Sequence, residues 1–298
     1  MDELAILNLI TQILPEQAEK IKDFLFETFN YVPKIGILGK TGVGKSSLCN
    51  ALFGKDRAPV TPVHSCTREA KEYEGQIGSG KIKLVDLPGA GENQKRDVEY
   101  KDLYSKHLPD MDVVLWVLKA DDKAFSCDED FYHNIVKPHL EQGKPFIIVL
   151  NQVDKVDPYR EWDIENCKPG QQQQNNIDAK IKLVAEKFEV DSKNVIPVSS
   201  TDKYNLRTLV ETIIYAVPNE KKVTVLNAVK DENRSDKSKE EAKRGFFEWL
   251  GEELGEFIAG EDGKKIGKVA GYLIDKAPLV DKVLIIANGL AKMLFPWW

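Results

Sequence analysis

The sequence predicts an α/β fold in which a mainly parallel central sheet is extended by helices at both ends of the chain. Short apolar runs that end in polar motifs recur between residues 34 and 198, as buried parallel strands do. A glycine-rich loop joins the first run to a helical segment. We therefore expect N-terminal amphipathic helices over residues 1–33, an α/β domain over residues 34–218 and a C-terminal helical region over residues 219–298.

Residues 2–30 are expected to form one or two amphipathic helices. Apolar residues recur at helical spacing on either side of Pro15, so the proline should divide the segment. Met1-Asp-Glu-Leu4 lacks the basic start of a signal peptide, and Gln12 and two glutamates interrupt the apolar stretch. We expect this segment to pack on the α/β domain or on the C-terminal helices.

The segment Gly39–Ser46 matches the pattern G-x-x-x-x-G-K-[ST] and lies between an apolar strand and a helix start. Its glycines let backbone N–H groups converge on phosphates, and the helix N-terminus adds partial positive charge. Lys45 would reach the β- and γ-phosphates, and the Ser46 hydroxyl would bind Mg²⁺. The pattern predicts a nucleoside triphosphate site. Its expected contact residues are Lys40, Thr41, Gly42, Val43, Gly44, Lys45, Ser46 and Ser47.

The next predicted strand, Ile82–Val85, ends in Asp86-Leu-Pro-Gly89. A carboxylate at this position can hold Mg²⁺ through water, and the Gly89 N–H can bind the γ-phosphate. The same four residues alone would be an ordinary turn. Because they follow the strand after the phosphate loop, we expect Asp86 to serve the metal.

Two later strands are expected to carry the base-binding groups. Residues 146–150 lead into Asn151-Gln152-Val153-Asp154, and an aspartate there accepts hydrogen bonds from guanine N1–H and the 2-amino group. Adenine lacks both donors, so the site should reject ATP. Residues 195–198 lead into Ser199, Ser200 and Thr201, where a backbone N–H would bind guanine O6. The expected ligand is therefore GTP or GDP.

Helices are expected between these motifs. Their predicted ranges are 128–141, 177–189 and 206–216. Residues 156–176 include prolines, a glycine and four consecutive glutamines, and we expect them to form a mobile polar excursion.

The order of these motifs resembles that of the translation-factor-related GTPases, and most closely the Era-like branch. Three longer runs are similar to a bacterial, often prophage-linked group within it: residues 39–53, 85–92 and 115–122. The resemblance implies a P-loop GTPase (G) domain that hydrolyses GTP to GDP and phosphate with Mg²⁺. It implies that Thr67 is the switch threonine, with Thr61 as the weaker candidate. The implied catalytic residues are Lys45, Thr67 and Gly89, and the implied metal ligands are Ser46, Thr67 and Asp86.

Three departures from the wider family affect the expected chemistry. Ala90 stands where related enzymes place a water-orienting glutamine, so intrinsic hydrolysis should be slow. Gly42 replaces the asparagine that binds an activating potassium ion in some relatives. Gln152 replaces the usual lysine of the guanine motif, which should weaken binding while Asp154 preserves selectivity. Arg57 and Arg68 are the candidates for an internal arginine finger, although we favour a solvated switch-loop cation for Arg68. By analogy with other GTPases, pairing of two G domains is an alternative source of the missing groups.

Composition limits the partners and the compartment. A net charge of −6 and a pI near 5.5 give no general attraction to nucleic acid, which is not an expected partner. Gly260–Gly263 has the spacing of an RNA-binding loop, but its two acidic residues would repel a phosphate backbone. The four cysteines and four histidines show no metal or disulfide spacing. We expect a reduced, cytoplasmic protein without zinc.

The C-terminal region leaves two functional alternatives open. Residues 231–244 should form a solvated helix or linker, and the glycines of 260–263 should interrupt the helical pattern that follows. The uncharged run at 283–291 is far shorter than the roughly 18 residues of a membrane span. We expect the C-terminal helices to pack as a hairpin, with an amphipathic region that lies on a membrane or binds a partner as the alternative. In the first functional alternative, the protein is a GTP hydrolase that acts as a molecular switch. Alternatively, it is an interaction or peripheral membrane protein that binds GTP or GDP as a structural ligand. The sequence identifies no effector.

Overall fold

The computed structural model describes residues 23, 27, 31–54, 71–77, 80–87, 97–122, 124–140 and 143–270. Predictions for the N-terminal helices, apart from residues 23 and 27, lie outside this part of the chain. So do those for Arg57, Thr61, Thr67, Arg68, Gly89, Ala90 and residues 271–298. The described residues fall into two compact units. One contains residues 33–217 and 227–235, and the other contains residues 31–32, 218–226 and 236–270.

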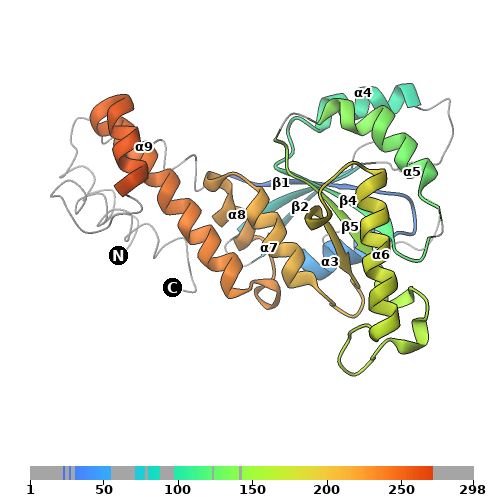
Figure 1. Cartoon of the computed structure of the whole chain (residues 1–298). Coiled ribbons are helices and arrows are strands. Elements are labelled where there is room, and N and C mark those ends of the chain that lie inside the picture. Colours follow the sequence, from blue (N-terminus) through green and yellow to red (C-terminus); the bar gives the residue numbers. More distant parts are fainter. Residues whose placement is uncertain are drawn as a thin grey trace. The chain divides into compact units, whose positions relative to one another are not determined.

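The first unit is built on a six-stranded sheet in the order β2-β3-β1-β4-β5-β6 (Figure 1). Only β2 is antiparallel to its neighbour, so the sheet is mainly parallel, as predicted. The strands are β1 (Lys34–Leu38), β2 (Lys71–Ile77), β3 (Gly80–Asp86), β4 (Val113–Lys119), β5 (Phe146–Asn151) and β6 (Val195–Val198).

Burial explains which strands the sequence predicts. Strand β4 is buried at every residue but the last, and β5 at every residue but the first, so both are continuous apolar runs. Strand β2 lies at the edge of the sheet, and its sequence KEYEGQI is polar. An edge strand needs no apolar run. Strand β2 therefore lacks the pattern on which the strand predictions were based, and it was not predicted.

Helices cover both faces of the sheet (Figure 1). One face packs against α4 (Asp97–His107), α5 (Ser126–Phe131) and α6 (Gln171–Lys187), around the buried Trp116 of β4. The Trp116 ring makes edge-on contacts with Tyr132 and Phe188 at centroid distances of 5.9 and 6.0 Å. The opposite face carries α3 (Lys45–Phe53) and α7 (Leu206–Ala216). This layering brings the carboxyl ends of β1, β3, β4, β5 and β6 to the same edge of the sheet.

Two predictions between β4 and β6 need correction. The helix expected at 128–141 is instead α5, followed by a π-turn at 132–136 and a 3-10 turn at 137–139. Residues 157–170 are exposed or partly exposed, as expected of a polar excursion, and contain a 3-10 turn at Tyr159–Glu161. Residues 171–176 are instead part of α6, which already begins at Gln171. The glutamine-rich stretch is the first turn of that helix.

The second unit contains most of α8 (Lys222–Asn227) and all of α9 (Asp236–Ala270). Helix α9 continues through Gly260 and Gly263, so the interruption predicted there is wrong. Among the described residues, no helix combines the length and the apolar character needed to cross a membrane.

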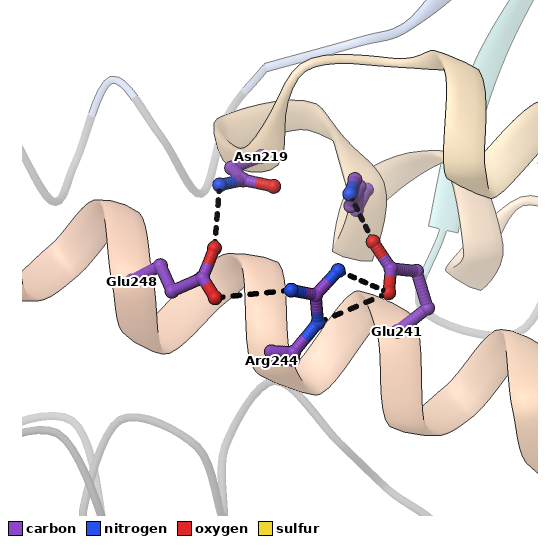
Figure 2. Close-up of polar contacts among 5 residues, drawn as sticks. Asn219, Glu241, Arg244 and Glu248 are labelled. Carbon is purple, nitrogen blue, oxygen red and sulfur yellow. Dashed lines mark hydrogen bonds and ion pairs between the residues drawn. The ribbon is translucent and has the colours of Figure 1, made fainter. Parts of the chain in front are cut away.

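The charged start of α9 is also more buried than the sequence suggests. The Glu241 and Lys222 side chains form an ion pair and are only 5% and 6% exposed. Arg244 donates to Glu241 Oε2 at 2.6 Å, and its second arm lies 3.2 Å from Glu248 Oε1 (Figure 2). Asn219 Nδ2 donates to Glu248 at 3.2 Å. Residues 231–244 are therefore not simply a solvated segment.

Burial disfavours ionisation of Glu241, but hydrogen bonds from Lys222 and Arg244 outweigh it and hold the pKa of this carboxyl below its usual value. Because the Glu241 pKa is lower in the folded protein than in the unfolded chain, where it is about 4.3, ionised Glu241 stabilises the folded state at pH values above about 4.3. That contribution is lost as the pH falls through the folded pKa.

We expect Glu241→Leu to lower the free energy of unfolding by about 3–5 kcal/mol at neutral pH, because it leaves the buried Lys222 ammonium without this carboxylate. Adding Lys222→Met should recover most of the loss, since two apolar side chains then replace the pair. Urea unfolding of the four proteins in the cycle measures both effects. The difference between wild type and Glu241→Leu should shrink below about pH 4. A difference that does not depend on pH would contradict the role given to the carboxylate.

Candidate functional site

The loop between β1 and α3 can be formed only by glycine at two of its positions. Gly39, Gly42 and Gly44 have φ angles of +138°, +87° and +94°, which L side chains rarely adopt. A Cβ on Gly39 would lie 2.3 Å from the Val117 carbonyl oxygen, and one on Gly44 would lie 2.4 Å from Asn151 Nδ2. The loop backbone therefore packs closely against Val117 of β4 and Asn151 of β5, and leaves no room for a side chain at either glycine. Thr41 and Gly42 are exposed at its tip, whereas Val43 is buried.

Lys45 begins helix α3 and folds back into this loop. Its Nζ donates to the Gly39 carbonyl at 2.6 Å and to the Lys40 carbonyl at 3.3 Å. The same atom lies 3.8 Å from Asp86 Oδ1, at the end of β3. The first N–H groups of α3, which include those of Ser46 and Ser47, point out of the helix N-terminus and attract anions. An ammonium and a helix start within one loop are the groups that a phosphate site requires, as predicted for this segment.

Ser46 and Asp86 fit the predicted magnesium ion. A hydroxyl and a carboxylate are hard oxygen donors, and the Asp86 side chain is 23% exposed beside the loop. Within the described residues, no group of three or more His, Cys, Asp or Glu side chains could hold a metal. A site completed by phosphate oxygens needs no such group. Thr67 and Gly89, the remaining predicted residues of this end, lie outside the described residues.

Asn151 connects the phosphate loop to the base-binding motifs. Its side chain is almost fully buried, and its Nδ2 donates to the Val43 carbonyl at 2.9 Å. Its Oδ1 accepts from Ser200 Oγ at 2.8 Å and from the Ser200 N–H at 3.2 Å. One amide therefore fixes three loops that are far apart in the sequence.

Gln152 also contacts the phosphate loop. Its Nε2 donates to the Gly42 carbonyl at 3.0 Å, and its Oε1 accepts from Lys155 Nζ at 2.8 Å. The glutamine thus retains the loop contact that the usual lysine would make, and a nearby ammonium supplies positive charge. Lys155 belongs to none of the predicted motifs, so its contact with Gln152 was not expected.

We expect Gln152→Ala to weaken GTP binding about five- to tenfold, because it removes one hydrogen bond to the loop and the stem beside the base. Lys155→Ala should cost less than about threefold, since exposed charges contribute little. If Lys155 acts through Gln152, it should have no effect when Gln152 is already alanine. Titration of GTP into the four proteins tests this, and additive losses would contradict the coupling.

Asp154 lies in a 3-10 turn, Val153–Lys155, at the end of β5. The turn is closed by hydrogen bonds from Lys155 N to Gln152 O at 3.0 Å and from Val156 N to Val153 O at 3.1 Å. Val153 is fully buried, while Asp154 is partly exposed. The aspartate is thus presented at the surface by a turn that is anchored in the core.

The loop after β6 has two N–H groups that remain suitable for guanine O6. The Ser199 N–H is already bonded to the Tyr204 carbonyl, in a bridge that returns a bond from Tyr204 N to Ser199 O. The Ser200 N–H makes only the long bond to Asn151, which a base oxygen can share. Within the described residues, the Thr201 N–H has no bonded partner. Of the predicted donors, the N–H groups of Ser200 and Thr201 are therefore better suited to guanine O6 than that of Ser199.

Lys40, the second residue of the loop, forms an ion pair with a buried aspartate. Its Nζ lies 2.6 Å from Asp128 Oδ2, and the Asp128 side chain is 2% exposed. Burial raises the pKa of the Asp128 carboxyl, and Lys40 opposes that shift. The pair ties the loop to α5. Asp128 was not predicted, because no local pattern marks an acid that is so far from the loop in the sequence.

Cys49 lies in α3 just behind the loop and is buried. Burial, with a smaller effect of Asp86, raises the pKa of its thiol to about 12. The thiol is therefore neutral and unreactive at physiological pH, which agrees with a structural role.

Comparison with known proteins identifies the family. Residues 34–152 match the family model described as 50S ribosome-binding GTPase. The chain is 39% identical to the uncharacterised protein YkfA of Escherichia coli K12 over 237 residues, and 38% identical to YfjP over 234 residues. Each of these matches covers 78% of this chain and 79% of the relative. GTPase Era of Aquifex aeolicus is 28% identical over 188 residues, covering 62% of this chain and 56% of Era.

Among solved structures, a single-residue variant of A. aeolicus Era bound to GDP·AlF4⁻ matches 63% of this chain and 57% of its own, with 29% identity and a TM-score of 0.47. The sequence matches include both the phosphate loop and the strand that leads to the guanine motif. The chain therefore belongs to the P-loop GTPases related to Era and Der, in the same family as YkfA and YfjP.

Proposed function

We propose that the protein binds GTP with Mg²⁺, hydrolyses it slowly to GDP and phosphate, and acts as a molecular switch. The family supports GTP binding and hydrolysis in general. The observation that carries the proposal is the link through Asn151, which joins the phosphate loop to the loops that would hold guanine. A site for a nucleotide needs both ends at a fixed separation.

The phosphate end would work by positioning and charge. Loop N–H groups and the start of α3 would hold the β- and γ-phosphates, while the Lys45 ammonium moves from the Gly39 carbonyl to a phosphate oxygen. A water oxygen forms a bond to the γ-phosphorus as the bond to the β–γ bridging oxygen breaks, and GDP leaves with the electron pair. Mg²⁺, held by Ser46 and through water by Asp86, would neutralise charge on the phosphate oxygens.

The base end would select guanine. An ionised Asp154 would accept hydrogen bonds from N1–H and the 2-amino group, and an N–H of Ser200 or Thr201 would donate to O6. Slow hydrolysis follows from the alanine at position 90, which offers no side chain to orient the attacking water.

The proposal is tested by phosphate release from GTP with Mg²⁺ over a range of protein concentrations. Slow turnover at low concentration supports it, and a rate per molecule that rises with concentration would indicate groups supplied by a second G domain. No turnover at any concentration would favour a protein that binds the nucleotide only as a structural ligand. A switch also requires the GTP and GDP forms to differ, which limited proteolysis of the two forms measures.

A further inference from the structure

A buried glutamine holds the turn that presents Asp154. The Gln173 side chain, in the first turn of α6, is fully buried. Its Nε2 donates to the carbonyl oxygens of Val156 at 2.8 Å, Asp154 at 3.3 Å and Val153 at 3.5 Å. Val153 and Asp154 belong to the 3-10 turn, and Val156 is the residue that follows it.

These contacts determine the orientation of the amide. Three carbonyl oxygens surround the nitrogen, and an amide oxygen in the same place would be repelled by all of them. Oε1 is buried without a hydrogen-bond partner among the described residues. Burying an amide with an unsatisfied oxygen is unfavourable. The contacts to the turn are therefore what compensates for the burial of Gln173.

Glu161 fixes the helix that carries this glutamine. Its Oε2 accepts from the backbone N–H groups of Gln172 at 3.0 Å and of Gln173 at 3.2 Å, which are orphan donors of the α6 N-terminus. Asn176 Nδ2 donates to the Asp157 carbonyl at 2.7 Å. The first turn of α6 is thus bonded directly to the segment that follows Asp154.

The segment that follows Asp154 also contacts the loop after β6, which is the second proposed base-binding loop. The Trp162 ring contacts the Tyr204 ring edge-on at a centroid distance of 5.5 Å. Tyr204 forms the backbone bridge to Ser199, at the start of the loop that would bind guanine O6. Residues 156–173 therefore contact both proposed base-binding loops, which are the turn with Asp154 and the loop after β6.

We propose that Gln173 is a positioning residue for guanine recognition, which sets the place of the Asp154 carboxylate by binding the carbonyls of its turn. This inference rests on the proposed function, in which Asp154 reads the base. The Asp154 side chain can select between purines only if its backbone does not move, because the two base donors must be met together.

The test compares GTP with ITP, whose base lacks the 2-amino group. Wild-type protein should prefer GTP, since ITP leaves one oxygen of Asp154 without its donor. Gln173→Met keeps the volume of the side chain and removes its donors, so it should lower the GTP-to-ITP affinity ratio about tenfold. Gln171→Met makes the same change on an exposed residue of the same turn, whose side chain bonds to Asn175, and should leave the ratio unchanged. Equilibrium titrations with Mg²⁺ measure all the affinities.

The affinity ratio separates positioning from a general loss of stability, because partial unfolding weakens GTP and ITP equally. If Gln173→Met does not fold, the exposed Glu161 provides the second variant. Glu161→Ala frees the start of α6 and should lower the ratio in the same direction, whereas Glu161→Gln keeps an acceptor and should change it less.

Each outcome is decisive. A folded Gln173→Met protein with the wild-type ratio overturns the inference and leaves the proposed function intact. If Gln173→Met does not fold, an unchanged ratio in Glu161→Ala does the same. A wild-type protein that does not distinguish GTP from ITP overturns guanine reading by Asp154, and the inference falls with it.

Discussion

Lys45→Ala should lower the rate of GTP hydrolysis at least about 100-fold, the scale of losing one preorganised charge at a developing negative centre. In the structure, Lys45 Nζ lies among the Gly39 and Lys40 carbonyls and the Asp86 carboxylate, inside the phosphate loop. No other lysine of the predicted motif reaches that place, since Lys40 pairs with Asp128. Alanine has no donor there, so both triphosphate binding and turnover should suffer.

Phosphate release and GTP titration of the variant measure the two effects separately. Lys193→Ala removes an ammonium that is 75% exposed and serves as a control for the change in net charge. It should hydrolyse GTP at the wild-type rate. Hydrolysis by Lys45→Ala within a few fold of wild type would mean that the phosphates bind elsewhere.

Asp154→Asn should reverse the base preference from guanine to xanthine nucleotides. The carboxylate accepts from two donors of guanine, whereas an asparagine amide places a donor where xanthine carries its C2 oxygen. Once a bound base covers residue 154, polar groups left unpaired there are costly, so we expect the GTP-to-XTP affinity ratio to fall at least about 100-fold. Phosphate contacts do not change, so XTP should still bind with Mg²⁺.

Competition between GTP and XTP for the purified variant gives the ratio directly. Asp157→Asn makes the same substitution on an exposed aspartate of the following segment and should keep the wild-type ratio. A variant that continues to prefer GTP would place base recognition on another residue, and the guanine assignment would have to be abandoned.

The sequence predicts the parts of the fold that local pattern determines. Strand β5 and helix α7 are apolar at period-specific positions, and α7 has the predicted bounds, Leu206–Ala216. The glutamine-rich start of α6 has no such pattern, because only Gln173 of that turn is buried. Likewise, Gly260 and Gly263 do not end α9, since helix propensity is a weak preference that surroundings override.

The candidate site shows the same division. Lys45, Asp86 and Asn151 belong to short motifs whose spacing reflects chemistry, and the structure brings all three to one edge of the sheet. Asp128 and Gln173 act on these motifs from other elements, through a side chain that meets a loop only after folding. A single sequence contains no local signal for such a contact.

The buried amide of Asn151 also bears on how affinity arises. Because this one side chain bonds to Val43 and to Ser200, it fixes the distance between the phosphate loop and the loop after β6 before any ligand binds. A ligand then need not order the loops on arrival, and most of the entropy lost on association is its own. In the proposed site, the amide would hold the phosphate loop and the loop after β6 at a fixed separation. A nucleotide of matching length would then contact both loops at the same time.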